Sequence, residues 1–329
     1  MSGAIVGSDT IGSSAVAAIL GLSPWQSPHE VWARLVGLTS YSDKDTPVMK
    51  RGRMMERALL GWREEEYGIT IHRGPPITGE PWRPNETPTW RHSRPDGYAV
   101  IEGDIADGAP SVGTVVDLFE VKTARDFTGW GDEAEGLAGV PPYYAAQVLW
   151  QAATTAAMGI TVRRSYLLAF CPMREEFRAY TIERDERREA ALTAHIRGWW
   201  ERHVRDQVMP EIDGSEGAAR ALLALHRAPR PELREPTESE RELVEEWRAA
   251  KLAVAAAEAA ETAAANHVKA AIADARGLAG LADWRPTKGR VSVSVADIQK
   301  KAPALFAQLD AAGLIKTGEP TRTLVNLKE

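Results

Sequence analysis

The chain has 329 residues, of which 44% are apolar and 26% are charged, and its formal net charge is −6. It contains no apolar run long enough to span a bilayer and no basic-then-apolar signal peptide after Met1, so we expect a cytoplasmic protein without membrane association. The single cysteine, Cys171, excludes an internal disulfide, a four-cysteine zinc site and an iron–sulfur cluster held by four thiolates of this chain.

Three helices are predicted in the N-terminal part of the chain. The first is short and follows Ser13 and Ser14, which we expect to cap it. Receiving a phosphate at the helix N-terminus is the alternative role of these two serines. The second helix begins after Ser27, a capping residue, with Pro28 in its first turn. The third helix spans residues 47–67.

A proline- and glycine-rich loop over residues 74–95 leads into a predicted antiparallel hairpin. The hairpin sequence, PDGYAVIEGDIADGAPSVGTVVDLFEVKTA, contains two apolar strands joined by a turn at Asp107 and Gly108. A glycine-rich, acidic loop over residues 126–140 follows. The second hairpin strand carries the charges on which the functional prediction depends.

Two strands and two helices complete the first domain. The segment PPYYAAQVLWQAATTAAMG predicts a helix that ends at Gly159, and RRSYLLAFCP and EFRAYTIE predict strands. A further helix is predicted from about residue 185 to 207. These elements predict one α/β domain over residues 1–228, with a mixed central sheet flanked by helices.

The remaining residues, 229–329, predict a helical arm and a small α+β tail. A proline-rich, charged linker spans residues 229–236, and Thr237 and Glu240 then form a capping box that begins a long alanine-rich helix. Small alanine faces allow close helix packing, so we expect a helical hairpin or a coiled-coil arm. The segment after residue 281 predicts a strand pair that encloses a helix.

The acidic balance argues against nonspecific coating of nucleic acid, because proteins that do this are usually basic. A local basic groove remains open, with candidates in three clusters. These are Lys50, Arg51 and Arg53; Arg91 and Arg94; and Arg163 and Arg164. The sequence contains neither a GxxxxGK[ST] phosphate loop nor a GxGxxG turn. ATP-driven chemistry is therefore not expected.

Large apolar side chains outside the strands are interpreted as core residues. Trp25, Trp32 and Trp150 are predicted to fill the core rather than to stack on bases, because they fall on apolar helix faces. Cys171 is predicted to be a buried thiol at a strand end, with no base to activate it.

The strand sequence TVVDLFEVKTA carries two charges where an apolar strand is expected. Alternation places Val116, Leu118, Glu120 and Lys122 on one face. A lone buried charge costs several kcal/mol, on the order of its desolvation penalty. The pair therefore has to be an ion pair, be solvated in a cleft, or hold a metal ion.

Three carboxylates are predicted to converge at the end of this strand. Glu56 lies on the helix at 47–67, Asp96 opens the first hairpin strand, and Glu120 lies on the second. Carboxylates of this kind bind Mg²⁺ together with waters and substrate phosphates. Lys122 would act as a base or would stabilise charge on water and phosphate. The alternative is a simple ion pair beside an aspartate that starts a turn.

Five sequence motifs occur in a fixed order along the chain. They are IGSSAVAAILGLSPWQSPHEVW, GRMMERALLGW, RPDG, LFEVKTA and PPYYAAQVLWQ. A helix glutamate, PD, a strand ending in ExK and a glutamine-bearing helix resemble the PD-(D/E)xK nuclease pattern. More specifically, residues 9–205 resemble the lambda exonuclease branch, the YqaJ-type viral recombinase family.

The resemblance implies a PD-(D/E)xK nuclease core and a metal-dependent 5′-to-3′ exonuclease on linear double-stranded DNA. Such an enzyme leaves 3′ single-stranded overhangs for phage-type homologous recombination. Carried over by position, the resemblance implies Glu56, Asp96 and Glu120 as metal ligands, with the Val121 carbonyl as a main-chain ligand. Two Mg²⁺ ions are implied, with Mn²⁺ able to substitute.

The resemblance also implies roles for residues around the metal ligands. Lys122 corresponds to the catalytic lysine and Gln147 to the glutamine of the following helix. The family often shows Gln-x-Gln on this helix, whereas the next glutamine here is Gln151. Gln151 is either a substitute for the second glutamine or part of the helix surface.

An arginine that relatives carry shortly before the first helix is absent, because the segment GAIVGSDT holds no basic residue. The predicted grip on a 5′-phosphate therefore uses Ser13 and Ser14 with positive charge from Arg94 or Arg51. Lys50 and Arg53, beside Arg51, are further candidates for that charge.

The predicted partners follow from the same resemblance. They are double-stranded DNA, a single-strand annealing protein and further copies of the chain in a ring-shaped trimer, inside a bacterial host cell. Two other functions stay open, namely a structure-specific or restriction-type endonuclease of the same fold and a non-catalytic DNA-binding scaffold. Cas4-like relatives are excluded because the chain lacks the cysteines for their cluster.

Overall fold

The computed structural model describes residues 10–39, 47–75, 80–106, 108–226, 232–289 and 294–315. The side chains of residues 48 and 49 are outside this description. The chain divides into two compact units, residues 1–227 and 228–329. Each unit is described by itself below, beginning with the first.

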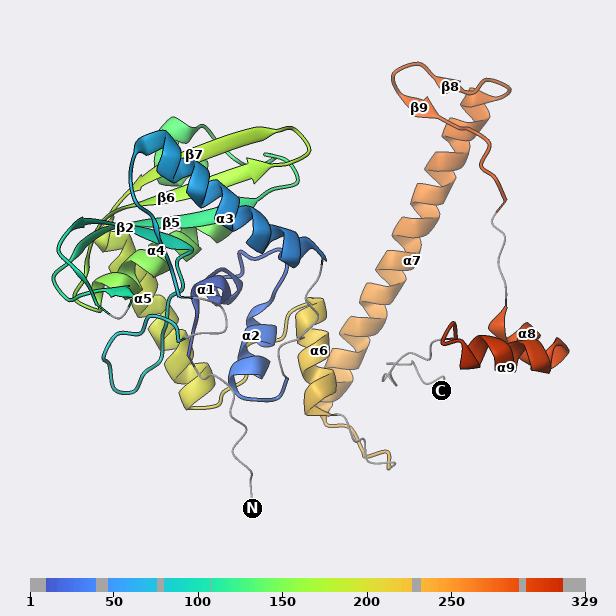
Figure 1. The fold of residues 1–329 in the computed structure, drawn as a ribbon. Coiled ribbons are helices and arrows are strands. Elements are labelled where there is room, and N and C mark those ends of the chain that lie inside the picture. The colour runs from blue at the N-terminus through green and yellow to red at the C-terminus, as the bar shows by residue number, and fades with distance from the viewer. Residues whose placement is uncertain are drawn as a thin grey trace. The chain divides into compact units, whose positions relative to one another are not determined.

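A five-stranded mixed sheet forms the centre of the first unit (Figure 1). Its strands, in spatial order, are β1 (His72–Arg73), β2 (Gly97–Glu102), β5 (Val115–Thr123), β6 (Thr161–Cys171) and β7 (Glu176–Glu183). Strands β5 and β6 pair in parallel, and the other neighbours pair antiparallel. The predicted mixed α/β architecture is confirmed.

The predicted hairpin is also confirmed, because β2 pairs antiparallel with β5. Gly97 lies opposite Phe119 in this pairing. The connection forms a second, small hairpin of β3 (Ile105–Ala106) and β4 (Ala109–Pro110). Of the predicted turn residues, Gly108 has a positive φ of 77°, which glycine adopts without strain, and Asp107 lies outside the described residues.

Helices cover both faces of the sheet. Side chains alternate along β5, so successive residues of this strand contact different helices. Helix α3 (Pro47–Tyr67) lies on one face of the sheet (Figure 1). There its Leu60 belongs to the cluster that contains Phe119 and Val121. Helix α4 (Pro142–Ala156) covers the other face, where Ala152 shares a cluster with Leu118. The two faces of β5 therefore look at two different helices.

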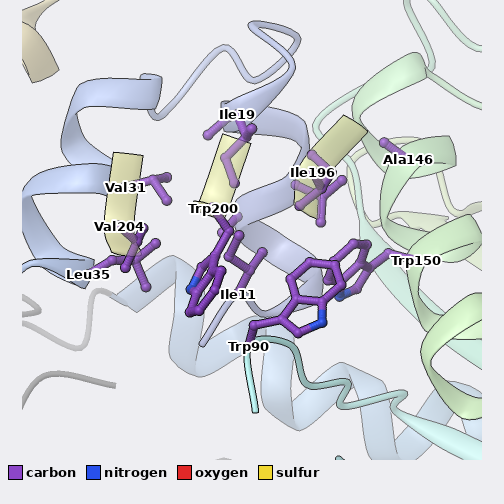
Figure 2. Close-up of a cluster of buried hydrophobic side chains, with 13 residues drawn as sticks. Ile11, Ile19, Val31, Leu35, Trp90, Ala146, Trp150, Ile196, Trp200 and Val204 are labelled. Carbon is purple, nitrogen blue, oxygen red and sulfur yellow. The ribbon is translucent and has the colours of Figure 1, made fainter. Parts of the chain in front are cut away.

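A second layer of helices packs against α4. It consists of α1 (Ser13–Ile19), α2 (Pro28–Leu35), α5 (Glu186–Trp200) and the π-helical turn η2 (Glu201–Arg205), and α6 (Glu216–Leu225) packs on α2. Figure 2 shows their shared core, in which Trp90 and Trp150 make an edge-to-face contact at 5.6 Å between ring centroids. The buried Trp150 donates its indole N–H to the His92 carbonyl at 3.0 Å, which ties α4 to the segment before β2.

Besides the short strands β1, β3 and β4, a 3-10 segment and a helix of this unit were not predicted. The loop at 126–140 contains a 3-10 segment, η1 (Glu133–Gly139), which begins at Asp132 with a side-chain cap. Helix α6 was missed, although Ser215 caps it and its first turn carries Glu216. The cap and the apolar run that follows were the available signals for α6.

The second unit begins with α7 (Glu238–Ile272), whose predicted capping box of Thr237 and Glu240 is present. This helix is continuous, so it does not form the hairpin that was one of the two predicted alternatives, and the coiled-coil arm stays a prediction. A strand pair follows, consisting of β8 (Gly277–Leu278) and β9 (Ala282–Asp283), and then α8 (Val295–Lys301) and α9 (Pro303–Ala311). None of the helices in the described segments has the length and apolar character that crossing a bilayer requires.

The tail contains more helix than was predicted. Two short helices replace the single one expected, and the strand pair β8–β9 lies before both of them. The two segments predicted as enclosing strands include residues 290–293 and 316–329, which lie outside the described residues.

Candidate active site at the end of strand β5

The site begins where β5 extends beyond its neighbour β2. Pairing between the two strands starts at Gly97 and Phe119, so Val121 has no partner residue on β2. Asp96, just before β2, fills this position, because its Oδ2 accepts the Val121 N–H at 2.7 Å. This hydrogen bond fixes the carboxylate of the RPDG segment against the strand that carries Glu120 and Lys122.

Glu120 lies at the centre of a cluster of hydrogen-bond donors. Its carboxylate is only 3% exposed, and its Oε1 accepts from the Lys122 ammonium and from Gln147 Nε2, the latter at 2.5 Å. Its Oε2 accepts from Gln151 Nε2 at 2.7 Å. Gln147 and Gln151 are four residues apart, so α4 presents both to the same face of β5.

Gln151 is therefore buried against Glu120 rather than part of the helix surface. It is 1% exposed, and its Nε2 also donates to the Arg94 carbonyl at 3.3 Å. One amide thus connects the ExK strand, the RPDG segment and helix α4. Of the two roles that the sequence left open, this placement favours a substitute for the second glutamine of the family pattern.

Glu56 approaches from the opposite face of the sheet, because α3 packs on the Phe119 side of β5. Burial raises the pKa of Glu56, and the Glu120 charge raises it further, against the opposing charge of Arg73. Burial also raises the pKa of Asp96 well above its usual range, with Glu120 and then Glu56 adding to the effect and Lys122 opposing it. The three carboxylates are therefore close enough to repel one another.

No set of three or more His, Cys, Asp and Glu side chains within the described segments is arranged to hold a metal ion. Both oxygens of Glu120 accept hydrogen bonds from side-chain donors. The donor chemistry nevertheless suits a hard cation. A divalent cation would relieve the repulsion that raises the pKa of Asp96.

Lys122 is held as an ammonium group. Burial lowers its pKa, but the Glu120 and Asp96 charges outweigh this effect and raise the pKa overall. Its Nζ also lies 5.2 Å from the centroid of the Tyr144 ring, a cation–π distance. The structure therefore places a positive charge, rather than a neutral amine, beside Glu120.

Sequence comparison assigns the part of the chain that builds this site. Residues 6–158 match the sequence model of the YqaJ-like viral recombinase domain. This stretch is a YqaJ-like viral recombinase domain. It contains every residue of the Glu120 cluster and ends at residue 158, two residues after the end of α4.

Two solved structures resemble the chain at low sequence identity. An alkaline exonuclease from Laribacter hongkongensis is 18% identical, with a TM-score of 0.42 over 61% of this chain and 92% of that one. A phage-related exonuclease from Haemophilus somnus is 11% identical, with a TM-score of 0.35 over 60% and 96% of the two chains. No curated protein matches the sequence.

The predicted phosphate-binding serines of the YqaJ-like domain do not cap helix α1. The N-cap is Gly12, and no side chain caps this end, so the capping prediction for Ser13 and Ser14 is wrong. The Ser13 hydroxyl is buried without a hydrogen-bond partner, whereas Ser14 is exposed. The helix starts two residues earlier than predicted, which places both serines inside its first turn.

The basic candidates are distributed over several elements. Arg94 precedes Asp96 and contributes its carbonyl to the Glu120 cluster, and Arg51 is exposed on α3, outside that cluster. Arg163 pairs with Asp117 through its Nε at 2.9 Å and through its Nη2. Arg164 pairs with Glu183 on β7. The last two arginines therefore serve ion pairs of the sheet.

The core predictions for large side chains were right in three of four cases. Trp32, Trp150 and Cys171 are buried, and the Cys171 thiol donates to the Arg125 carbonyl at 3.1 Å. Trp25 was predicted wrongly, because it is 66% exposed. It lies in the turn before α2 rather than on a helix face, and the serine and proline residues around it were the available signal.

Replacing Gln151 by leucine should destabilise the YqaJ-like domain by about 1–3 kcal/mol, because Glu120 Oε2 and the Arg94 carbonyl lose their shared donor. Urea unfolding followed by circular dichroism measures the effect. Gln147→Leu is the matched comparison, with a smaller loss expected because Lys122 still bonds the same Glu120 oxygen. Equal stability of Gln151→Leu and the wild type would contradict the assigned contacts.

Proposed function

We propose that the chain is a metal-dependent 5′-to-3′ exonuclease on linear double-stranded DNA that leaves 3′ single-stranded overhangs for phage-type recombination. The observation that carries the proposal is the Glu120 cluster, in which Lys122, Gln147 and Gln151 surround one buried carboxylate beside Asp96. The YqaJ-like domain that contains this cluster supports a phage-type DNA exonuclease.

Glu56, Asp96, Glu120 and the Val121 carbonyl are the groups that would hold Mg²⁺, as two ions or with Mn²⁺ in its place. When bound, such ions supply a nucleophilic water and neutralise charge on the phosphodiester. Lys122 then orients a phosphate oxygen and stabilises the negative charge that develops on it. Gln147 and Gln151 hold the Glu120 carboxylate in place through their amide hydrogen bonds.

The proposed activity is tested by DNA topology and by end chemistry. With Mg²⁺, linear duplex should be degraded and closed circular duplex should not, and a 5′-phosphorylated end should be degraded faster than a 5′-hydroxyl end. Replacing Arg94 by glutamine should reduce this preference more than it reduces binding to internal duplex, because its charge is proposed to contact the terminal phosphate. End-labelled substrates give the polarity.

Each contrary result points to a different activity. Nicking of closed circles would indicate an endonuclease of the same fold. Loss of label from the 3′ end would reverse the polarity. No cleavage by the folded protein with Mg²⁺ or Mn²⁺ would leave a DNA-binding scaffold.

We further propose that the protein assembles as a homotrimer and works with a single-strand annealing protein. An acidic chain that acts on DNA has reason to concentrate its positive charge in a sheltered channel, which a ring of subunits provides. Light scattering at micromolar concentration should give the mass of three chains. An active monomer would refute the ring.

A further inference from the structure

An aromatic cluster of Trp25, Tyr143 and Tyr144 lies beside the Glu120 cluster. Trp25 is 66% exposed, and its ring contacts Tyr143 edge to face, with 5.1 Å between centroids and 81° between planes. Its ring also lies 6.1 Å from that of Tyr144. An exposed tryptophan held against other rings, rather than free in solvent, is a typical binding surface.

The aromatic cluster is joined directly to the proposed catalytic lysine. The Tyr144 ring contacts the Trp25 ring. It also contacts Lys122, whose Nζ lies 5.2 Å from the centroid of the Tyr144 ring. Trp130 packs behind Tyr144 at 5.6 Å between centroids. Gln147 follows on the next turn of α4 and bonds Glu120. One aromatic ring therefore separates Trp25 from the ammonium group of Lys122.

The turn that carries Trp25 is held at both ends. The Ser23 hydroxyl accepts the backbone N–H groups of Trp25 and Gln26, both at 3.2 Å. The Ser27 hydroxyl accepts the Glu30 N–H at 3.3 Å and caps α2. Because these bonds fix the backbone before a ligand arrives, little ordering entropy is lost when the Trp25 ring binds one.

We propose that Trp25, with Tyr143 beside it, stacks on an unpaired nucleobase of the strand whose phosphodiester lies at Lys122. The inference rests on the proposed nuclease function and adds a base-binding subsite to it. Every nucleobase has a π face, so stacking holds a single strand without regard to sequence. A nucleobase is favoured over a second copy of the chain because Tyr144 contacts both Trp25 and Lys122, the charged group that would contact the phosphate.

Binding without metal tests the subsite independently of cleavage. In EDTA, a labelled short oligothymidylate should bind the wild type more tightly than an abasic deoxyribose–phosphate chain of equal length and charge. Trp25→Ala should weaken oligothymidylate binding about tenfold, within the range known for base–aromatic stacking, and leave abasic binding unchanged. Trp25→Phe should restore part of the preference because it restores a ring.

Trp62→Ala is the matched control. Trp62 is 44% exposed and packs edge to face on Phe177, on the α3 side of the sheet. The Trp62→Ala variant should keep the full preference for oligothymidylate over the abasic chain. Equal binding of both probes to the wild type, or an equal loss in both alanine variants, would overturn the subsite. So would an unchanged preference in Trp25→Ala accompanied by loss of self-association, since Trp25 would then contact another subunit.

Cleavage assays separate this inference from the proposed function. If the wild type prefers bases through Trp25 but cleaves no DNA with metal, the subsite stands and the nuclease is refuted. If it cleaves DNA, removing the terminal base from the substrate should slow the first turnover of the wild type and not that of Trp25→Ala. Equal slowing of both enzymes would refute the subsite and leave the nuclease intact.

Discussion

Asp96→Asn should abolish metal-dependent DNA cleavage and, at the same time, raise the thermal stability of the metal-free protein. The loss of cleavage, on the order of 10³-fold or more, follows from removing a charge that is proposed to hold the metal ion. The gain in stability follows from removing a buried carboxylate that Glu120 and Glu56 repel. Asparagine keeps a side-chain oxygen that can still accept the Val121 N–H.

The pH dependence of this gain is fixed by the sign of the pKa shift. The pKa of Asp96 in the folded protein is raised above 3.8 by burial and by neighbouring carboxylates, so the folded state binds its proton more tightly than the unfolded state. This tighter proton binding stabilises the fold fully at pH values below the pKa of Asp96 in the unfolded chain. The stabilisation is lost as the pH rises towards the pKa of Asp96 in the folded protein. The advantage of Asp96→Asn should therefore be larger at neutral pH than in acid.

Thermal unfolding in EDTA, followed by circular dichroism, measures the stability change. A domain of this size gains roughly 2–4 °C in Tm for each kcal/mol regained. Mg²⁺ should raise the Tm of the wild type and have little effect on Asp96→Asn. A lower Tm for the variant in EDTA, or an equal response to Mg²⁺, would contradict the assigned role.

Asp117→Asn is the matched control, because Asp117 is a buried aspartate on β5 that pairs with Arg163. This variant should lose stability, since it breaks a paired buried carboxylate, and should keep the cleavage chemistry. Opposite effects of the two substitutions on stability and on cleavage would distinguish a repelled buried carboxylate from a paired one.

Lys122→Met should lower kcat by about 10²–10³-fold while the protein still binds metal ions. The loss follows from removing the charge proposed to stabilise phosphate in the transition state. Metal affinity should be equal to that of the wild type or higher, because the Lys122 ammonium now occupies an oxygen of Glu120 that a cation would use. Methionine keeps most of the volume of the lysine stem, which limits disturbance of the packing.

Titration calorimetry with Mn²⁺ and single-turnover cleavage measure the two effects separately. Lys122→Arg distinguishes the two roles of the lysine, since arginine keeps the charge but cannot act as a base. Partial activity of Lys122→Arg is expected from the electrostatic role. Loss of metal binding in Lys122→Met would refute the electrostatic role of Lys122, because a residue that is not a metal ligand should not be needed for metal binding.

The sequence by itself determined the elements whose signals are local. Helix α3 ends where Gly68 follows it, and Gly68 has a positive φ of 61°. The capping box at Thr237 begins α7 as predicted. Strand alternation placed Glu120 and Lys122 on one face of β5, where they form an ion pair. In each case the determining residues are neighbours in the chain, so their spacing alone sets the geometry.

The tertiary structure decided what depends on packing between distant segments. Gln151 reaches Glu120 only because α4 lies on that face of β5, and Glu56 approaches from the other face because α3 packs there. Trp25 is exposed because its turn leads out of the core before α2 begins. Many helix arrangements bury an apolar stripe equally well, so the hydrophobic pattern does not specify which polar side chains meet above it.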